Sequence, residues 1–249
     1  IDHLSDRIYA YLDSYKKQGL NEGISENIIN VTGNPIVDII NDNQKIFDSG
    51  GEYLDDKIFD FIKNDNFTLT TSHRRENILD QKSLTNIVNL LNKSESKIIF
   101  PMGYKTQEML KEFNLDLKSN ILVTDPIGYL EFMYLMKNSE YVISDSGTVV
   151  EEACIIGKPS IQMRHSTERP EVYDVGSSIK FDPSADIKDF EDYINKVHKL
   201  TSNKWEQPFG DGKSSEKIVK DLVELSRADT FNKHSRNDYS YDVSNAFKE

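Results

Sequence analysis

Residues 143–153 read ISDSGTVVEEA and directly follow the apolar residues Tyr141 and Val142. An apolar run that stops at Asp-Ser-Gly-Thr and continues with helical spacing is typical of the strand-to-helix junction in a parallel α/β sheet. Two glutamates nevertheless stand in this otherwise apolar helix. The junction predicts the fold class and suggests that these carboxylates have a role beyond packing.

The rest of the chain repeats this junction. Short β-branched runs alternate with helical patterns about six times, and Leu84, Ile87, Val88 and Leu91 show the helical spacing clearly. Strands that are almost continuously apolar indicate a sheet covered on both faces. We therefore predict a Rossmann-like, doubly wound parallel α/β domain. Its expected strands are residues 28–33, 67–72, 97–102, 120–125, 141–146 and 160–164.

Composition narrows the function classes. The 249 residues are 37% hydrophobic and 29% charged, and no apolar run approaches the roughly 20 residues of a membrane helix. The net charge of -12 argues against a nucleic-acid partner, and we expect no membrane partner either. Cys154 is the single cysteine, so a reducing cytoplasm is the expected compartment. The histidines lack metal-ligand spacing, and we expect no metal and no cofactor.

Polar segments follow three of the expected strands. They are TSHRREN at residues 71–77, DP at 125–126 and DSGT at 145–148. Because ligands of open parallel sheets bind beyond the carboxyl ends of the strands, these segments should share one rim. Ser146, Gly147 and Thr148 would open a helix there, and free N–H groups at a helix start attract anions such as phosphate. The alternative is an ordinary helix cap at Ser146, which is the commoner use of such a serine.

The spacing favours a ligand site. Thr148 and Glu152 lie four residues apart on one helical face, where a carboxylate can accept two hydrogen bonds from a diol such as ribose. Glu151 should face solvent or a neighbouring loop. His73 ends a strand beside Arg74 and can donate a hydrogen bond to phosphate or act as a general acid, although an isolated histidine there is more often structural.

Six ordered motifs carry a family resemblance. They are VTGNPIVD (31–38), TSHRREN (71–77), DPIGYLEF (125–132), SDSGTVVEEACIIGKPSIQMR (144–164), TERPE (167–171) and FGDG (209–212). In this order and spacing the chain resembles the non-hydrolysing UDP-N-acetylglucosamine 2-epimerase family, from residue 1 to about 225.

The resemblance implies a two-domain, glycosyltransferase-B-like fold of which this chain is the C-terminal half. Residues 1–26 would then be the end of the first domain, residues 27–226 the UDP-binding domain with its C-terminal helices, and residues 227–249 a poorly ordered polar tail. The absence of an initiator methionine and of a signal-peptide pattern fits a fragment. At full length we expect a cytoplasmic homodimer.

The resemblance also implies residue roles. Ser146, Gly147 and Thr148 would hold the diphosphate of a UDP-sugar, Glu152 the ribose hydroxyls, and Phe132 the uracil. His73 would be the catalytic residue at the diphosphate. Arg74 would contribute positive potential or structure, and Arg164, Glu168 and Arg169 would form either a charged loop that braces the rim or purely structural ion pairs.

The implied reaction is elimination of UDP to a 2-acetamidoglucal and re-addition with inversion at carbon 2. The family's acidic acid/base candidates lie in its first domain, so this chain alone is expected to be inactive. Thr148 stands where a second glycine is common, and Met102 occupies a region where the family usually has a histidine. The sequence therefore leaves open an epimerase for another UDP-2-acetamido sugar of surface polysaccharides, a non-catalytic UDP-sugar-binding module, and a glycosyltransferase of the same fold.

Overall fold

The computed structural model describes residues 2–63 and 65–228, which form two compact units. The large unit comprises residues 39–209. The small unit combines the described residues up to 38 with those from 210 onward. Helix α2 (Pro35–Asp42) leads from one unit to the other.

The large unit is built on a six-stranded parallel sheet with the order β5-β4-β3-β6-β7-β8. The chain starts in the middle at β3, builds outward to β5, and then returns to add β6, β7 and β8 on the other side. This is the strand order of a Rossmann-type sheet, and its topological switch point lies between β3 and β6. The strands are β3 (Phe67–Thr71), β4 (Lys97–Pro101), β5 (Ile121–Thr124), β6 (Val142–Ser144), β7 (Ser160–Met163) and β8 (Ser178–Phe181).

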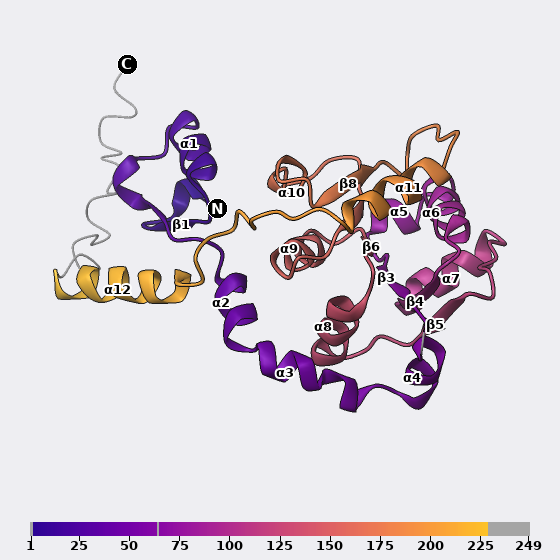
Figure 1. The fold of residues 1–249 in the computed structure, drawn as a ribbon. Coiled ribbons are helices and arrows are strands. Elements are labelled where there is room, and N and C mark those ends of the chain that lie inside the picture. The colour runs from indigo at the N-terminus through magenta and orange to yellow at the C-terminus, as the bar shows by residue number, and fades with distance from the viewer. Residues whose placement is uncertain (1, 64, 229–249) are drawn as a thin grey trace, which may run out of the picture. The chain divides into compact units, whose positions relative to one another are not determined.

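Helices cover both faces of this sheet, as the continuous apolar strands predicted. Helices α8 and α9 lie on one side and α6 and α11 on the other (Figure 1). The crossover helices are α5 (Arg75–Ile78), α6 (Gln81–Lys93), α7 (Tyr104–Glu112), α8 (Tyr129–Asn138), α9 (Gly147–Ile155) and α10 (Glu171–Asp174), followed by α11 (Glu191–Leu200). Before β3 the unit contains α3 (Gln44–Ser49), a 3-10 turn η3 (Gly50–Tyr53) and α4 (Asp56–Ile62).

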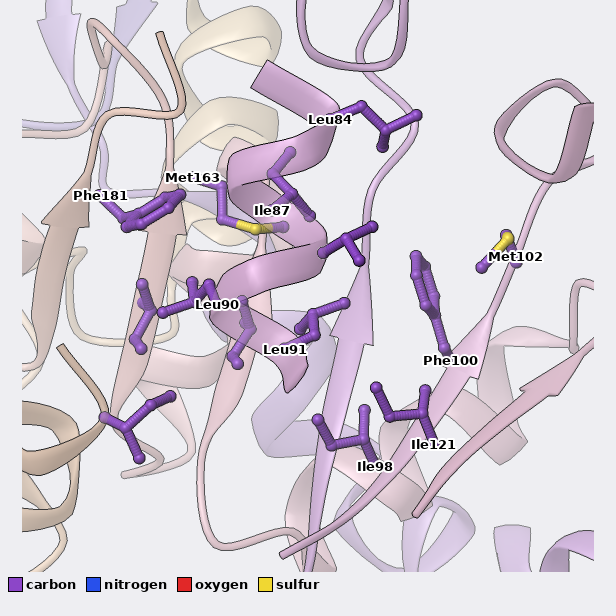
Figure 2. Close-up of a cluster of buried hydrophobic side chains, with 14 of the residues drawn as sticks. Leu84, Ile87, Leu90, Leu91, Ile98, Phe100, Met102, Ile121, Met163 and Phe181 are labelled. Atoms are coloured by element: carbon purple, nitrogen blue, oxygen red, sulfur yellow. The ribbon is translucent and has the colours of Figure 1, made fainter. Parts of the chain in front are cut away.

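The core against α6 explains why this segment is a helix. Asp80 caps its start by accepting a hydrogen bond from the Ser83 backbone N–H at 2.8 Å, and the apolar residues then recur on one face. Figure 2 shows these side chains pointing at the sheet. The buried cluster contains Leu84, Ile87, Leu90 and Leu91 from α6 and Ile98, Phe100, Ile121, Met163 and Phe181 from the strands.

The small unit contains a short parallel β-α-β element. Strands β1 (Ile8–Ala10) and β2 (Ile29–Val31) pair in register and are joined by α1 (Asp13–Asn21), with 3-10 turns η1 (Asp2–Leu4) and η2 (Glu26–Ile28). Helix α12 (Ser214–Arg227) belongs to the same unit. Arg7 and Tyr9 both donate hydrogen bonds to Asp221 of α12, at 2.8 and 2.9 Å, so the helix is fastened to the strand segment by polar contacts.

Within the small unit, the segment before α2 approaches the segment before α12 closely. A Cβ atom added at Gly210 would lie 2.9 Å from the Cα of Gly33, and both residues have positive φ, +120° and +89°. Glycine is required at such a backbone-to-backbone approach. Asp38 then accepts the backbone N–H groups of Ser214 and Ser215, at 3.1 and 2.6 Å, and caps the start of α12. The motifs VTGNPIVD and FGDG are therefore one local structure.

The strands of the structure differ from the predicted strands in two respects. The expected strand at residues 28–33 exists as β2 but pairs with β1 and not with the six-stranded sheet. Strands β1 and β8 were not predicted. The compact units divide after residues 38 and 209. The UDP-binding domain of residues 27–226 stays a prediction. The remaining predicted segment, 227–249, lies outside the described residues from 229 onward.

Candidate functional site

The site lies at the switch point of the sheet. Strands β3 and β6 are neighbours, and their register pairs Thr71 with Ser144. Their carboxyl ends are therefore level, and the loop with His73 begins beside the loop with Asp145 and Ser146. Two of the three polar segments expected on one rim thus emerge side by side from adjacent strands.

Asp145 joins these two loops. It is fully buried, and its Oδ2 accepts hydrogen bonds from the Ser72 hydroxyl at 3.1 Å and from the backbone N–H groups of His73 and Arg74 at 2.9 Å each. Asn77 donates to the same oxygen at 3.3 Å. The Nδ1 of His73 lies 3.3 Å from the other oxygen, Oδ1, while the His73 side chain is 61% exposed. The histidine is thus held from behind and open toward solvent.

The helix that follows begins at Gly147. Ser146 is its N-cap, and the Ser146 hydroxyl accepts a long hydrogen bond of 3.4 Å from the Val149 N–H. The ordinary capping role that the sequence suggested as an alternative is therefore present. Thr148 is exposed beside it, and the N-terminal turn of α9 carries the partial positive charge that attracts anions. Capping and anion binding are compatible here.

A charged loop stands over this helix start. Arg164 is buried and forms an ion pair of 2.7 Å with Glu168, which lies so close to Gly147 that an added Cβ would be 2.7 Å from its Oε1. Burial by itself would raise the Glu168 pKa, but the hydrogen bond from Arg164, a backbone hydrogen bond and the charges of Arg164 and Arg169 together hold it below its usual value. Arg169 forms an ion pair with Glu151. The sequence predicted that Glu151 faces either solvent or a neighbouring loop. In the structure it is buried against the loop that carries Arg169.

Glu152 is the second carboxylate of the opening sequence. It is 3% exposed, and the Tyr129 hydroxyl donates a hydrogen bond of 2.8 Å to its Oε1. Burial raises the Glu152 pKa to about 7, the Tyr129 hydrogen bond opposes this shift, and the charge of Glu151 adds to it. Burial beside Glu152 also raises the pKa of Tyr129, so this hydroxyl keeps its proton and acts as the donor. Tyr129 was not among the predicted site residues, although it lies in the motif DPIGYLEF.

His73 and Phe132 line one pocket of about 310 Å³. Its other lining residues come from the ends of β3 and β4, the loop before α8 and the first turn of α9: Thr71, Ser72, Pro101, Gly103, Pro126, Ile127 and Val149. The pocket therefore adjoins the helix start at Ser146. Arg74 is turned away from it, forms an ion pair with Glu76, and lines a separate pocket of about 160 Å³ together with Arg164.

Met102 lies in the region of the rim where the family resemblance leads us to expect a histidine. It is 1% exposed and belongs to the core cluster under α6 and α7. The chain accordingly has an apolar residue packed inward at this point. Within residues 2–63 and 65–228, no group of three or more His, Cys, Asp or Glu side chains is arranged to hold a metal ion. None of the helices described here has the length and apolar content of a membrane span.

The family model for UDP-N-acetylglucosamine 2-epimerase matches residues 1–223. The chain belongs to this family. The UDP-N-acetylglucosamine 2-epimerase of Methanocaldococcus jannaschii is 41% identical over 232 residues, which cover 89% of this chain and 62% of the relative. The enzyme of that name from Methanococcus maripaludis is 40% identical over 232 residues, covering 88% and 61%.

Solved structures agree with this family assignment. The crystal structure of the Methanocaldococcus jannaschii UDP-GlcNAc 2-epimerase in complex with UDP-GlcNAc and UDP superimposes with a TM-score of 0.76 at 39% identity, covering 90% of this chain and 62% of that one. The Neisseria meningitidis UDP-GlcNAc 2-epimerase bound to UDP-GlcNAc gives 0.67 at 27% identity. The Rossmann-like half of a glycosyltransferase-B-like fold is thus confirmed, and the chain spans about three fifths of the length of these relatives.

The residues at the switch point of this chain fall into two groups. The first group borders the space for a ligand: His73 and Phe132 line the pocket, and Ser146 and Gly147 form the start of α9 beside it. Glu152 lies one turn further along α9. Asp145 and Tyr129, which the sequence analysis did not single out, stand behind His73 and Glu152 and hydrogen-bond to the site from the protein side.

Proposed function

We propose that this chain is the UDP-binding part of an enzyme that interconverts UDP-N-acetylglucosamine and UDP-N-acetylmannosamine. The observation that carries the proposal is the switch-point arrangement, in which an exposed histidine and a helix start with free N–H groups border one pocket. This is where a Rossmann-type sheet binds nucleotides. The names of the relatives, which cover most of this chain, point to the same substrate.

The residue roles follow from the chemistry of each position. The start of α9, at Ser146, Gly147 and Thr148, suits the diphosphate because its N–H groups and helix dipole favour an anion. Ionised Glu152 is an acceptor only and suits the two ribose hydroxyls. Phe132 offers an aromatic surface to the uracil on the same pocket.

The proposed reaction is an elimination followed by re-addition. A base removes the proton at carbon 2, the electrons of the bond between carbon 1 and oxygen leave with UDP, and a double bond forms between carbons 1 and 2. UDP then adds back at carbon 1 while carbon 2 takes a proton on its other face. His73 would donate a hydrogen bond to the departing diphosphate and stabilise the charge that develops there. The base is proposed to come from the first domain of the family.

Partners and compartment are part of this proposal. The binding partner is a UDP-sugar, the compartment is the cytoplasm, and the full-length protein is a homodimer. The cysteine that the chain contains, Cys154, is buried, and burial raises its pKa to about 11, so its thiol stays protonated and unreactive. A reducing compartment is compatible with such a residue.

One observation favours a second substrate. Thr148 presents a branched, exposed side chain at the helix start, where the resemblance leads us to expect a second glycine. A side chain there changes the space beside the diphosphate. The alternative function is therefore 2-epimerisation of another UDP-2-acetamido sugar. The two substrates can be distinguished by comparing the binding of UDP-N-acetylglucosamine with the binding of UDP-2-acetamido sugars that are modified at carbons 3 and 6.

Calorimetry with two ligands tests the binding assignment. At about pH 8, where Glu152 is ionised, Glu152→Gln should weaken UDP binding about 10-fold or more, because a hydrogen bond to a charged group contributes about 1.5–3 kcal/mol. Inorganic pyrophosphate lacks the ribose and should lose less than about twofold. Glu112→Gln, an exposed substitution at the end of α7, controls for the lost charge. Equal losses for both ligands would remove the ribose role of Glu152.

A second experiment separates binding from turnover. Incubated with UDP-N-acetylglucosamine in deuterated buffer, this chain alone should bind the nucleotide weakly and incorporate no deuterium at carbon 2. A protein extended to the length of the relatives should incorporate it. If the extended protein binds UDP-sugar without any exchange, the chain is a binding module and not part of an epimerase.

A further inference from the structure

The carboxylate of Asp145, which follows β6, accepts several hydrogen bonds from the loop after β3. Its Oδ2 receives the hydroxyl of Ser72 and the backbone N–H groups of His73 and Arg74, all within 3.1 Å. These donors account for one oxygen of the carboxylate. They hold the loop after β3 in place and fix the carboxylate plane.

The other oxygen, Oδ1, is in a different position. It is buried and has no hydrogen-bond partner among the described residues, although the Nδ1 of His73 lies 3.3 Å away. A buried acceptor without a donor costs about 1–3 kcal/mol. Because the His73 side chain is 61% exposed, its ring can turn by the few tenths of an ångström that bring Nδ1 into hydrogen-bond range. Oδ1 therefore favours a proton on Nδ1.

We propose that Asp145 is a positioning residue that fixes the tautomer of His73. An ionised carboxylate only accepts hydrogen bonds, so the Nδ1 that faces it must carry the proton. Nε2 is then the nitrogen left for the ligand. In a cationic His73 both nitrogens carry protons, Oδ1 stabilises the charge, and Nε2 donates to an anion in the pocket. The identity of that anion as a diphosphate rests on the proposed function, whereas the tautomer does not.

The position of Asp145 in the chain gives this arrangement a second consequence. The residues that follow it directly are Ser146 and Gly147, the start of α9. A single rigid carboxylate thus fixes both the ring of His73 and the entry of the chain into the proposed anion site. The distance between these two groups is set by the backbone register of β3 and β6 and by one buried side chain.

Nitrogen-15 NMR of the imidazole rings tests the proposal in the 249-residue chain without any ligand. In the neutral ring, the His73 signals, assigned by their loss in His73→Asn, should show the proton on Nδ1. A His73 with its proton on Nε2 alone would overturn the proposal. Because UDP is absent, failure of the proposed function leaves this result unaffected.

Asp145→Asn supplies the complementary test. The Asn oxygen must stay with the backbone N–H groups of His73 and Arg74, which leaves its NH₂ group facing His73 Nδ1. Two donors cannot share that contact, so the proton should move to Nε2. An unchanged tautomer in a folded Asp145→Asn protein would contradict the proposal. If this variant does not fold, the result for the wild-type ring decides.

A matched control comes from another aspartate–histidine pair. His165 Nδ1 lies 2.7 Å from Asp182 Oδ2, and this histidine is 80% exposed. Asp182→Asn removes the same charge as Asp145→Asn and should leave the His73 signals unchanged. A change of the His73 tautomer in Asp182→Asn would show that general electrostatics, and not the contact with Asp145, sets the proton position.

Discussion

Glu152 provides the sharpest prediction because its burial shifts the pH at which it ionises and thereby makes the stability of the fold depend on pH. The carboxyl is 3% exposed, and its pKa is raised from 4.5 to about 7. The folded protein therefore keeps a proton on Glu152 at a pH where the unfolded chain has lost it. Since the native state binds more protons, the free energy of unfolding must fall as pH rises through this range.

The magnitude follows from the two pKa values. The difference between 4.5 and about 7, at about 1.4 kcal/mol for each pKa unit, corresponds to about 3 kcal/mol. This contribution is fully present below pH 4.5 and is lost by the time the pH exceeds about 7. Glu152→Gln removes the titration and keeps an oxygen that accepts the Tyr129 hydroxyl. The variant should therefore be more stable than the wild type, and its advantage should grow by about 2 kcal/mol between about pH 5 and about pH 8.

Urea unfolding followed by the fluorescence of Trp205 measures this difference. Trp205 is the single tryptophan of the chain, and its indole N–H donates a hydrogen bond of 2.9 Å to the Cys154 carbonyl at the end of α9. Its signal therefore reports on the helix that carries Glu152. Because wild type and variant are compared at each pH, other titrating groups cancel.

A gap between the two proteins that stays constant from about pH 5 to about pH 8 would refute this reasoning, since burial would then not shift the Glu152 titration. Tyr129→Phe adds a directional control. It removes the hydrogen bond that favours the ionised form, so the pH-dependent loss should become larger in that background. Glu112→Gln, at an exposed position, should change the unfolding free energy by only a few tenths of a kcal/mol at either pH.

Three further predictions address other parts of the molecule. In a protein of the relatives' full length, His73→Asn should lower turnover by about 10² to 10⁴ with little change in KM or melting temperature, because a hydrogen bond that strengthens as charge develops acts on the transition state; normal turnover would make His73 structural. Gly147→Ala should weaken UDP binding in a calorimetric titration, because its Cβ would lie 2.7 Å from Glu168 Oε1, and Glu168, which is held by Arg164, would have to shift beside the proposed anion site; unchanged binding would show that this glycine is not needed there. Asp38→Ala should lower the unfolding free energy by about 1–2 kcal/mol at neutral pH, through loss of the α12 cap. Burial opposes ionisation of Asp38, but the hydrogen bonds from Ser215 and Ser214 hold its pKa below 3.8, so the difference between the proteins should shrink in acid urea melts below that pH.

The fold was largely predictable because burial leaves a clear pattern in the sequence. Five of the six expected strands lie in the large sheet, where both faces are covered and most of the strand residues are apolar. Strand β8 was missed because it is an edge strand: Ile179 is half-buried and Lys180 is exposed, so the apolar run is broken. Strand β1 has three residues, too few for a periodicity.

The site was predictable where it depends on neighbours in sequence. Helix geometry alone fixes how Ser146, Gly147 and Glu152 lie relative to one another along α9, whereas their roles toward a ligand stay predictions. Asp145 was visible in the sequence, but its role was not, because the carboxylate points at a loop 72 residues earlier. That contact exists because the register pairs Thr71 with Ser144, and register between non-consecutive strands is set by the packed sheet.

The meeting of Gly33 and Gly210 has a consequence for how this protein can be rearranged. The backbone at Gly33 approaches the backbone at Gly210, and these two residues precede and follow residues 39–209 closely in sequence. In sequence, residues 39–209 are therefore a domain inserted into the small unit, and a short linker could join the segments that flank it. Such a segment can be exchanged between related genes with two cuts, and recombination at these two glycine motifs would transfer the residues of the proposed nucleotide site together.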